Sequence, residues 1–180
     1  MKWIVVTVAM STYALISACS LAERALPGVT LSNADVLGIL NTIHHSEIDA
    51  GQLARDRASS EEVRAYASRM VNEHQMQMQE TDQLAQRMKI DPHNPALAAT
   101  FKNAHQNAME DLRDNTGTSF DQTYLAYQIK LHQQAVNFVH TTAGSVEDPQ
   151  LKRFLGEVGL DLQGHLAAAQ SVRRQILNGQ

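Results

Sequence analysis

The sequence predicts an all-α protein: an antiparallel four-helix bundle with an additional short helix between its second and third long helices. Three observations predict this class. The 180 residues include only 9 glycines and 4 prolines, and Ala, Leu, Gln and Met are plentiful, a composition typical of helical bundles. Apolar residues recur at helical spacing nearly to the end of the chain. No segment alternates apolar and polar residues for long enough to form a strand.

Each long helix is predicted to begin at residues that can cap it. Ser32 with Asp35 resembles a capping box, Ser60 precedes two glutamates, and Asp148 precedes a proline. Thr118 and Asp121 are predicted to cap the third long helix. The four long helices are predicted over about 32–57, 60–89, 118–144 and 149–178.

The segment from 90 to 117 connects two predicted helical hairpins. Pro92 and Pro95 break the chain, because two prolines this close cannot lie inside a helix. A shorter helix follows and ends near Gly117. This segment either caps an up-down bundle or forms a long ferritin-like crossover, and its length is compatible with both.

Charge and cysteine content exclude several classes of protein. The chain has 15 basic and 19 acidic residues, a formal charge of −4, which argues against a nucleic acid as partner. A single cysteine permits neither an intramolecular disulfide nor a zinc finger. The sequence also lacks a G-x-S-x-G nucleophile motif and a phosphate-binding glycine loop.

The first 18 residues are typical of an export signal. One charge, at Lys2, precedes a mostly apolar run that is shorter than the roughly 20 residues of a membrane-spanning helix. The run ends in Ile16-Ser17-Ala18-Cys19, which resembles a lipobox, and this resemblance implies lipid attachment at Cys19. We therefore expect a signal peptide over 1–18, a tether over 19–31 and the bundle domain over 32–178.

The lipobox resemblance also implies a location. A lipid at Cys19 would make the membrane a partner of the protein, and Ser20, in place of an aspartate, indicates an outer-membrane lipoprotein facing the periplasm. Two alternatives remain. Cleavage near Ser20-Leu21-Ala22 would release a soluble periplasmic protein, and an uncleaved segment would form a membrane anchor.

Each long helix carries one ionisable residue in the middle of its apolar seam: Glu47, His74, His132 and His165. At about 1.5 Å per residue they lie at similar heights, so we expect them to converge near the middle of the bundle. Three imidazoles and a carboxylate suit zinc, iron, copper or manganese. A buried hydrogen-bond network without a metal explains the same pattern.

Two further residues lie at positions that could support these four. His44 comes three residues before Glu47, and Asp161 comes four residues before His165, where it could orient the imidazole. Gly51 and Gly164 lie nearby and would permit close approach of helices.

Several short motifs occur in an order that resembles one bacterial family of exported four-helix proteins, catalogued as domain of unknown function DUF4142. The motifs are Gly51-Gln52-Leu53-Ala54, Met70-Val71-Asn72-Glu73-His74, Phe120-Asp121-Gln122-Thr123-Tyr124, His132 and His165-Leu166. The resemblance implies a ferritin-like bundle, and the family's recurrent histidines match His74, His132 and His165. The family usually has aspartate where this chain has Glu73, and its activity is not established.

Comparison with ferritin-like di-iron proteins narrows the kind of site. Those proteins use Glu-x-x-His on two helices, whereas the residues three before the histidines here are Val71, Ile129 and Leu162. Ferroxidase or iron-storage chemistry is therefore not expected, and a mononuclear site remains.

We consequently expect a lipid-anchored bundle that binds one transition-metal ion, such as zinc, iron or copper. One alternative is a metal-dependent redox or hydrolytic enzyme that uses the same residues. The other is a structural or envelope-stress protein with a metal-free polar network.

Overall fold

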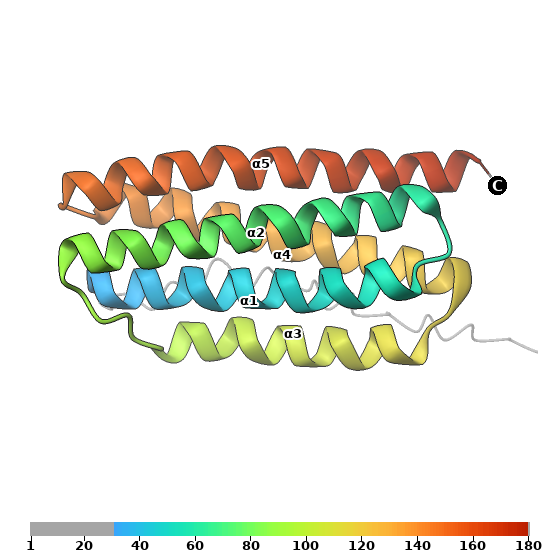
Figure 1. Cartoon of the computed structure of the whole chain (residues 1–180), viewed down its shortest axis with the longest axis horizontal. Coiled ribbons are helices and arrows are strands. Elements are labelled where there is room, and N and C mark those ends of the chain that lie inside the picture. Colours follow the sequence, from blue (N-terminus) through green and yellow to red (C-terminus); the bar gives the residue numbers. More distant parts are fainter. Residues whose placement is uncertain (1–30, 180) are drawn as a thin grey trace, which may run out of the picture.

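The computed structural model describes residues 31–179, which form five helices and no strand (Figure 1). Both the all-α class and the short helix between the second and third long helices are confirmed. The signal-peptide, tether and Cys19 predictions lie mostly outside the described residues and stay predictions. Within the described part, no helix is both long and apolar enough to cross a membrane. The helices are α1 (Asn33–Arg57), α2 (Glu61–Met88), α3 (Ala96–Asp114), α4 (Gly117–Ser145) and α5 (Pro149–Asn178).

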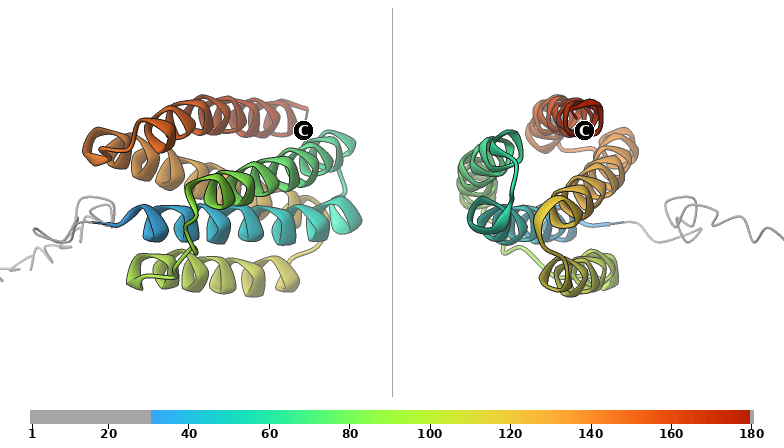
Figure 2. Two further views of the ribbon diagram at one scale, coloured as in Figure 1. Left: turned by 60° about the vertical axis from the view of Figure 1, so that its left-hand side comes forward. Right: turned by 90° about the vertical axis from the view of Figure 1, so that its right-hand side faces the viewer.

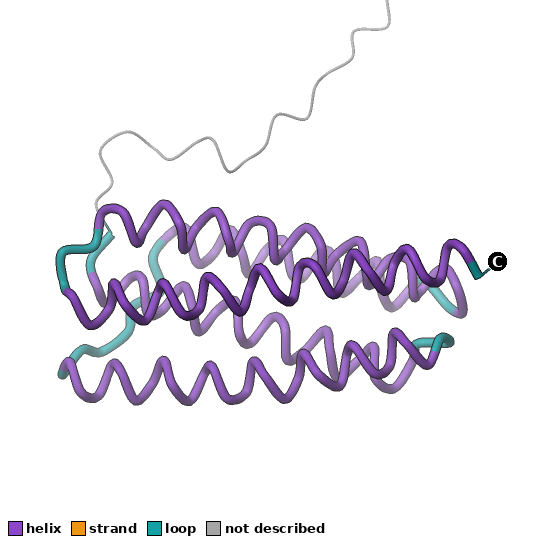
Figure 3. Tube along the Cα trace, turned by 90° about the horizontal axis from the view of Figure 1, so that it is seen from above, coloured by secondary structure: helices purple, strands orange, loops and turns teal. Residues whose placement is uncertain are grey.

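The bundle consists of α1, α2, α4 and α5, and α3 lies outside it. Each of α1–α2 and α4–α5 forms an antiparallel hairpin, and the two hairpin turns lie at opposite ends of the bundle (Figure 1). The loops lie at the two ends of the helices (Figure 3). Because α3 carries the chain back along the bundle, α2 and α4 run in the same direction. The connection is therefore the ferritin-like crossover, and the up-down arrangement is not formed.

Side-chain caps begin three of the long helices, as predicted. Ser32 accepts a hydrogen bond from Asp35 N, and the Asp35 carboxylate accepts one in return from Ser32 N, completing a capping box. Ser60 caps α2 through Val63 N, and Asp148 caps α5. These local signals explain why the predicted helix ends agree closely with the observed ones.

The prediction that Asp121 caps its own helix is wrong. Its buried carboxylate instead accepts hydrogen bonds from Ser59 N at 2.9 Å, Ser59 Oγ at 2.6 Å and Ser60 N at 2.8 Å. The N-cap of α4 is Thr116, without a side-chain hydrogen bond. The crossover explains the difference, because it brings the start of α4 beside the α1–α2 turn.

A polar layer divides the apolar core into two clusters. Along α1, one cluster includes Val36 to Ile43 and the other begins at Ala50. The same division recurs on the other bundle helices, where buried polar residues separate the two clusters. The ionisable seam residues lie in this gap, with apolar packing on both sides along the bundle axis.

Two glycines of α1 allow close packing. A Cβ on Gly38 would lie 1.5 Å from the carbonyl oxygen of His93, where the crossover passes over the helix. A Cβ on Gly51 would lie 2.8 Å from Val71 Cγ2 and 3.2 Å from Ala67 O, as expected for a close approach of α1 and α2. The corresponding expectation for Gly164 is wrong, because a Cβ there would meet nothing within 4 Å.

Candidate metal centre

Three histidines from three helices converge in the polar layer. His74 of α2, His132 of α4 and His165 of α5 each offer a ring nitrogen, and these nitrogens lie within 4.8 Å of one another. Their ring centroids are 5.0 to 5.7 Å apart. All three residues are buried, with at most 2% of their surface exposed. Such a group is able to hold a metal ion.

A directed hydrogen-bond chain sets the orientation and tautomer of His74. Thr81 Oγ1 donates to the carbonyl oxygen of Gln77 at 2.8 Å, so it is free to accept from His44 Nε2 at 3.4 Å. His44 Nδ1 then carries a lone pair and accepts from His74 Nδ1 at 3.0 Å. With its proton on Nδ1, neutral His74 has a lone pair on Nε2.

His132 is oriented by a hydrogen bond to a backbone carbonyl, with a carboxylate close to the same nitrogen. Its Nδ1 lies 2.9 Å from the carbonyl oxygen of Gln128 and 3.2 Å from Glu47 Oε1. A carbonyl oxygen only accepts, so Nδ1 carries the proton and Nε2 of the neutral ring carries the lone pair. The backbone carbonyl holds the plane of the ring, as the outer hydrogen-bond partners of ligating histidines do in metal sites, and the Glu47 carboxyl lies against the same nitrogen.

His165 is oriented by a carboxylate from α2. Its Nε2 donates to Glu73 Oε2 at 2.6 Å, and Arg69 Nε donates to the other carboxylate oxygen at 2.8 Å. The pKa of Glu73 is lowered: burial raises it, but the hydrogen bonds from Arg69 and His165 outweigh burial. The lone pair of His165 is therefore on Nδ1.

The three remaining nitrogens have no hydrogen-bond partner within the described part of the chain. They are His74 Nε2, His132 Nε2 and His165 Nδ1. Burial lowers the pKa of His74 well below its usual value and also lowers the pKa of His165, which favours neutral rings. Buried imidazole nitrogens with free lone pairs are the donor set that a transition-metal cation requires.

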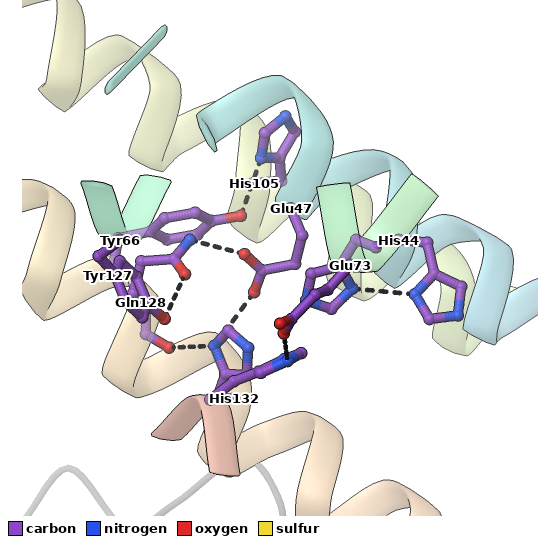
Figure 4. Close-up of polar contacts among 10 residues, drawn as sticks. His44, Glu47, Tyr66, Glu73, His105, Tyr127, Gln128 and His132 are labelled. Carbon is purple, nitrogen blue, oxygen red and sulfur yellow. Dashed lines mark hydrogen bonds and ion pairs between the residues drawn. The ribbon is translucent and has the colours of Figure 1, made fainter. Parts of the chain in front are cut away.

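Glu47, predicted as a fourth ligand, lies behind His132. Its fully buried carboxylate contacts the outer nitrogen of that ring, and Oε2 accepts from Gln128 Nε2 at 2.6 Å (Figure 4). Tyr66 OH donates to Gln128 Oε1 at 3.0 Å, which fixes the orientation of that amide. Burial raises the pKa of Glu47, while nearby His132 and the hydrogen bond from Gln128 lower it, and the rise dominates.

Of the two residues predicted to support the site, His44 contacts a site histidine and Asp161 does not. His44 contacts His74, as described above, although its position was predicted from its spacing to Glu47. Asp161 accepts a hydrogen bond from Gln77 Nε2 at 3.1 Å. The position beside His165, which was predicted for Asp161, is occupied by Glu73.

Sequence reasoning missed several polar partners. Glu73 was noted only within a family motif, although its place one residue before His74 turns it toward α5. Gln128 and His105 belong to no motif that marks them. Gln128 contacts Glu47 and Tyr66, and Nδ1 of His105 lies 2.9 Å from Tyr127 OH and its Nε2 2.9 Å from Asp49 Oδ2. The crossover explains this miss, because it brings α3 beside α1 and α4.

A surface groove of about 330 Å³ between α2 and α5 leads to this layer. Glu73 and His165 line it, so the outer side of the histidine group borders the groove. The remaining lining residues are Arg69, Met76, Gln77, Glu80, Leu160, Asp161 and Gly164.

Comparison with known proteins bears on the fold and the family. CopM in the Cu(II)-bound form has a similar structure, with a TM-score of 0.63 and 13% sequence identity over 82% of this chain and 99% of that chain. At this identity the likeness shows the fold alone. No curated protein sequence matches. The model of the family described as domain of unknown function (DUF4142) matches residues 19–172, so the chain belongs to that family.

Proposed function

We propose that this protein binds one divalent transition-metal ion, Zn²⁺ or Cu²⁺, through His74 Nε2, His132 Nε2 and His165 Nδ1. The observation that carries the proposal is the set of three buried lone-pair nitrogens that face one another without a partner. A bound cation would satisfy all three at once. Without one, each buried nitrogen would lack the hydrogen bond that it makes in water, at a cost of about 1 to 3 kcal/mol.

The surroundings of the three nitrogens support a cation. Glu47 places a buried carboxylate against the outer nitrogen of His132, and Glu73 does the same for His165. Carboxylates in these positions raise the basicity of ligating imidazoles and fix their tautomers. Metal binding would also compensate the buried charge of ionised Glu47.

The donor set favours zinc or copper. Neutral imidazole suits both ions, and Cu²⁺ forms the stronger complexes of the divalent series. CopM, whose fold is similar, was solved in a Cu(II)-bound form, and this supports including Cu²⁺ beside Zn²⁺. Glu47 Oε1 lies against the outer nitrogen of His132, so we assign Glu47 to the support of that ring and not to the metal.

The experiment is to purify the exported protein, remove metal with a chelator, and titrate it with Zn²⁺ and with Cu²⁺. We expect one ion per chain in the wild type and a loss of at least about 100-fold in affinity in His132→Ala, because a ligand is lost. His140→Ala is the matched control, since His140 lies on the same helix and is exposed. A wild type that binds neither ion, or that binds no better than His132→Ala, would overturn the proposal.

We further propose that the protein is a lipoprotein anchored at Cys19 to the outer membrane and facing the periplasm. The lipobox-like sequence supports this, and the family model begins to match at residue 19. We expect Cys19→Ala to abolish incorporation of labelled palmitate and to release the protein from the membrane fraction. Two results would contradict the anchor: Cys19→Ala protein that leaves the membrane but still incorporates palmitate, or wild-type protein that is bound to the membrane without incorporating palmitate.

A further inference from the structure

We propose that the groove between α2 and α5 is the route by which the metal ion enters and leaves the three-histidine site. The inference rests on the proposed function and adds a path to it. It predicts which residues control the rates of metal uptake and release, as distinct from the residues that set affinity.

The arrangement of the helices leaves this side of the bundle open. The α1–α2 and α4–α5 sides are packed hairpins, and α3 covers the side between α1 and α4 (Figure 2, right). Among the described helices, none lies over the fourth side, between α2 and α5. The groove lies there and reaches the layer of histidines at His165.

The end of the groove meets the site. His165 lines the groove, and its unpartnered Nδ1 is one of the three converging nitrogens. Its Nε2 is bound by Glu73, whose side chain is about one-third exposed and also lines the groove. An ion that passes Glu73 would therefore next meet a histidine of the proposed site.

Charge along the groove favours cations. Glu73, Glu80 and Asp161 are acidic, and Arg69, which pairs with Glu73, is the basic member of the lining. A cleft lined mainly by one sign of charge concentrates ions of the opposite sign and speeds their association. The groove therefore attracts a divalent cation and repels anions.

The buried amide of Gln77 could contact an ion on its way from solvent to the histidines. Gln77 is 5% exposed and lines the groove, and its Nε2 donates across the groove to Asp161. Its Oε1 has no hydrogen-bond partner among the described residues. The amide and carboxylate oxygens together form a hard-donor pair that can take over part of the hydration of an entering ion.

Gly164 allows the route to be closed without disturbing the site. It lines the groove on α5, and an added Cβ would meet no atom within 4 Å. A leucine there would start from open space, extend over the groove and also favour the helix. Gly156 is the matched control, because it is an exposed glycine of the same helix, has equally open space and lies outside the groove lining.

The test compares the rates of Zn²⁺ uptake and release in Gly164→Leu and Gly156→Leu. Uptake is followed by stopped flow, and release by transfer of Zn²⁺ to a chromophoric chelator. Blocking a route slows both directions equally, so we expect Gly164→Leu to slow both by roughly 10-fold, with Kd changed by less than about twofold. Gly156→Leu should behave as the wild type.

A second pair of variants tests the charge of the groove. Glu80→Gln/Asp161→Asn should reduce the uptake rate several-fold at low salt and flatten its dependence on ionic strength. Glu110→Gln/Glu157→Gln removes the same charge from exposed positions outside the groove lining and should change neither.

The outcomes separate the inference from the proposed function. A wild type that binds neither Zn²⁺ nor Cu²⁺ would overturn the proposed function and this route with it, and a wild type that binds Cu²⁺ alone is tested by the same rates measured with Cu²⁺. If the wild type binds Zn²⁺ and Gly164→Leu exchanges it at the wild-type rate, only the route is overturned. A changed Kd with an unchanged uptake rate in Gly164→Leu would also contradict the route, because it would show an effect on the bound state.

Discussion

The carboxylate of Glu73 lies 2.6 Å from Nε2 of His165, between the open groove and the buried histidines. The hydrogen bond runs from one helix hairpin to the other, because Glu73 belongs to α2 and His165 to α5. It leaves the Nδ1 lone pair of His165 directed inward. One surface carboxylate thus sets the tautomer of a buried ligand.

We predict that Glu73→Leu weakens Zn²⁺ binding by roughly 10- to 100-fold, because loss of such a supporting acceptor frees both the orientation and the tautomer of the imidazole. Glu73→Asp should retain more affinity than Glu73→Leu, since it keeps a carboxylate. Competition with a chelator of known affinity measures the change. Glu62→Leu serves as the control, because Glu62 is an exposed acid of the same helix. Equal affinity in Glu73→Leu and Glu62→Leu would contradict the prediction.

Glu47 supports His132 from the opposite side of the site, and its burial makes a second prediction. Burial raises the pKa of Glu47, so its ionised form destabilises the metal-free fold at neutral pH. We predict that Glu47→Gln weakens Zn²⁺ binding by roughly 10- to 100-fold without lowering the free energy of unfolding of the metal-free protein. Urea denaturation with and without Zn²⁺ measures both quantities.

Glu47→Ala provides the contrast for this second prediction. It should destabilise the metal-free protein by about 2 to 4 kcal/mol, because it leaves a cavity and an unpaired Gln128 amide. A similar loss of stability in Glu47→Gln would show that the charge of Glu47 stabilises the metal-free fold, contrary to the prediction.

A third prediction concerns pH. Burial lowers the pKa of His44 from 6.5 to about 3, with smaller contributions from His45 and His165. Between these two values the unfolded chain binds a proton that the folded chain does not, so the free energy of unfolding falls as pH falls. Each such histidine contributes up to about 1.4 kcal/mol per pH unit within that window.

We therefore predict that His44→Gln flattens the decline in stability of the metal-free protein between pH 6.5 and pH 4. Gln52→Ala, at an exposed and non-titrating position of the same helix, provides the control and should leave the slope unchanged. Urea denaturation at several pH values in the presence of a chelator measures the slope. Parallel slopes in His44→Gln and the wild type would show that His44 does not titrate in this way.

The helices and their ends were predictable because their signals are local. The caps at Ser32, Ser60 and Asp148 lie within three residues of the groups that they satisfy. The direction of the crossover was not predictable, because a 28-residue connection with one helix fits either topology. Only contacts of α3 with α1 and α4 decide it.

The candidate site likewise has some features that were predictable from the sequence and others that were not. His74, His132 and His165 lie at similar heights along the apolar seams of their helices, so helical spacing alone predicts that they share one layer. Whether a carboxylate such as Glu47 points at the centre or at the back of a ring depends on sub-ångström packing between helices. Likewise, the Asp121 contact with Ser59 joins residues 62 apart in sequence, and no local pattern indicates it.

The fourth prediction concerns the contribution of Asp121 to stability. Its carboxylate accepts three hydrogen bonds from the α1–α2 turn, and a carboxylate acceptor strengthens each of them. We predict that Asp121→Ala lowers the free energy of unfolding by about 2 to 4 kcal/mol, with no change in Zn²⁺ stoichiometry. Asp111→Ala, an exposed acid on α3, should change stability by less than about 0.5 kcal/mol. A loss in Asp121→Ala as small as in Asp111→Ala would contradict this assignment.

The last prediction concerns the path of the crossover over Gly38. A Cβ there would lie 1.5 Å from the carbonyl oxygen of His93, while His93 N donates to Ala34 O at 3.0 Å. Gly38→Ala must therefore displace the crossover, and we predict a loss of about 1 to 3 kcal/mol in the free energy of unfolding. Gly156→Ala makes the same change in open space and should stabilise the protein by up to about 1 kcal/mol. The two substitutions should thus have opposite signs in urea denaturation. A stabilising Gly38→Ala would contradict the docking of the crossover against α1.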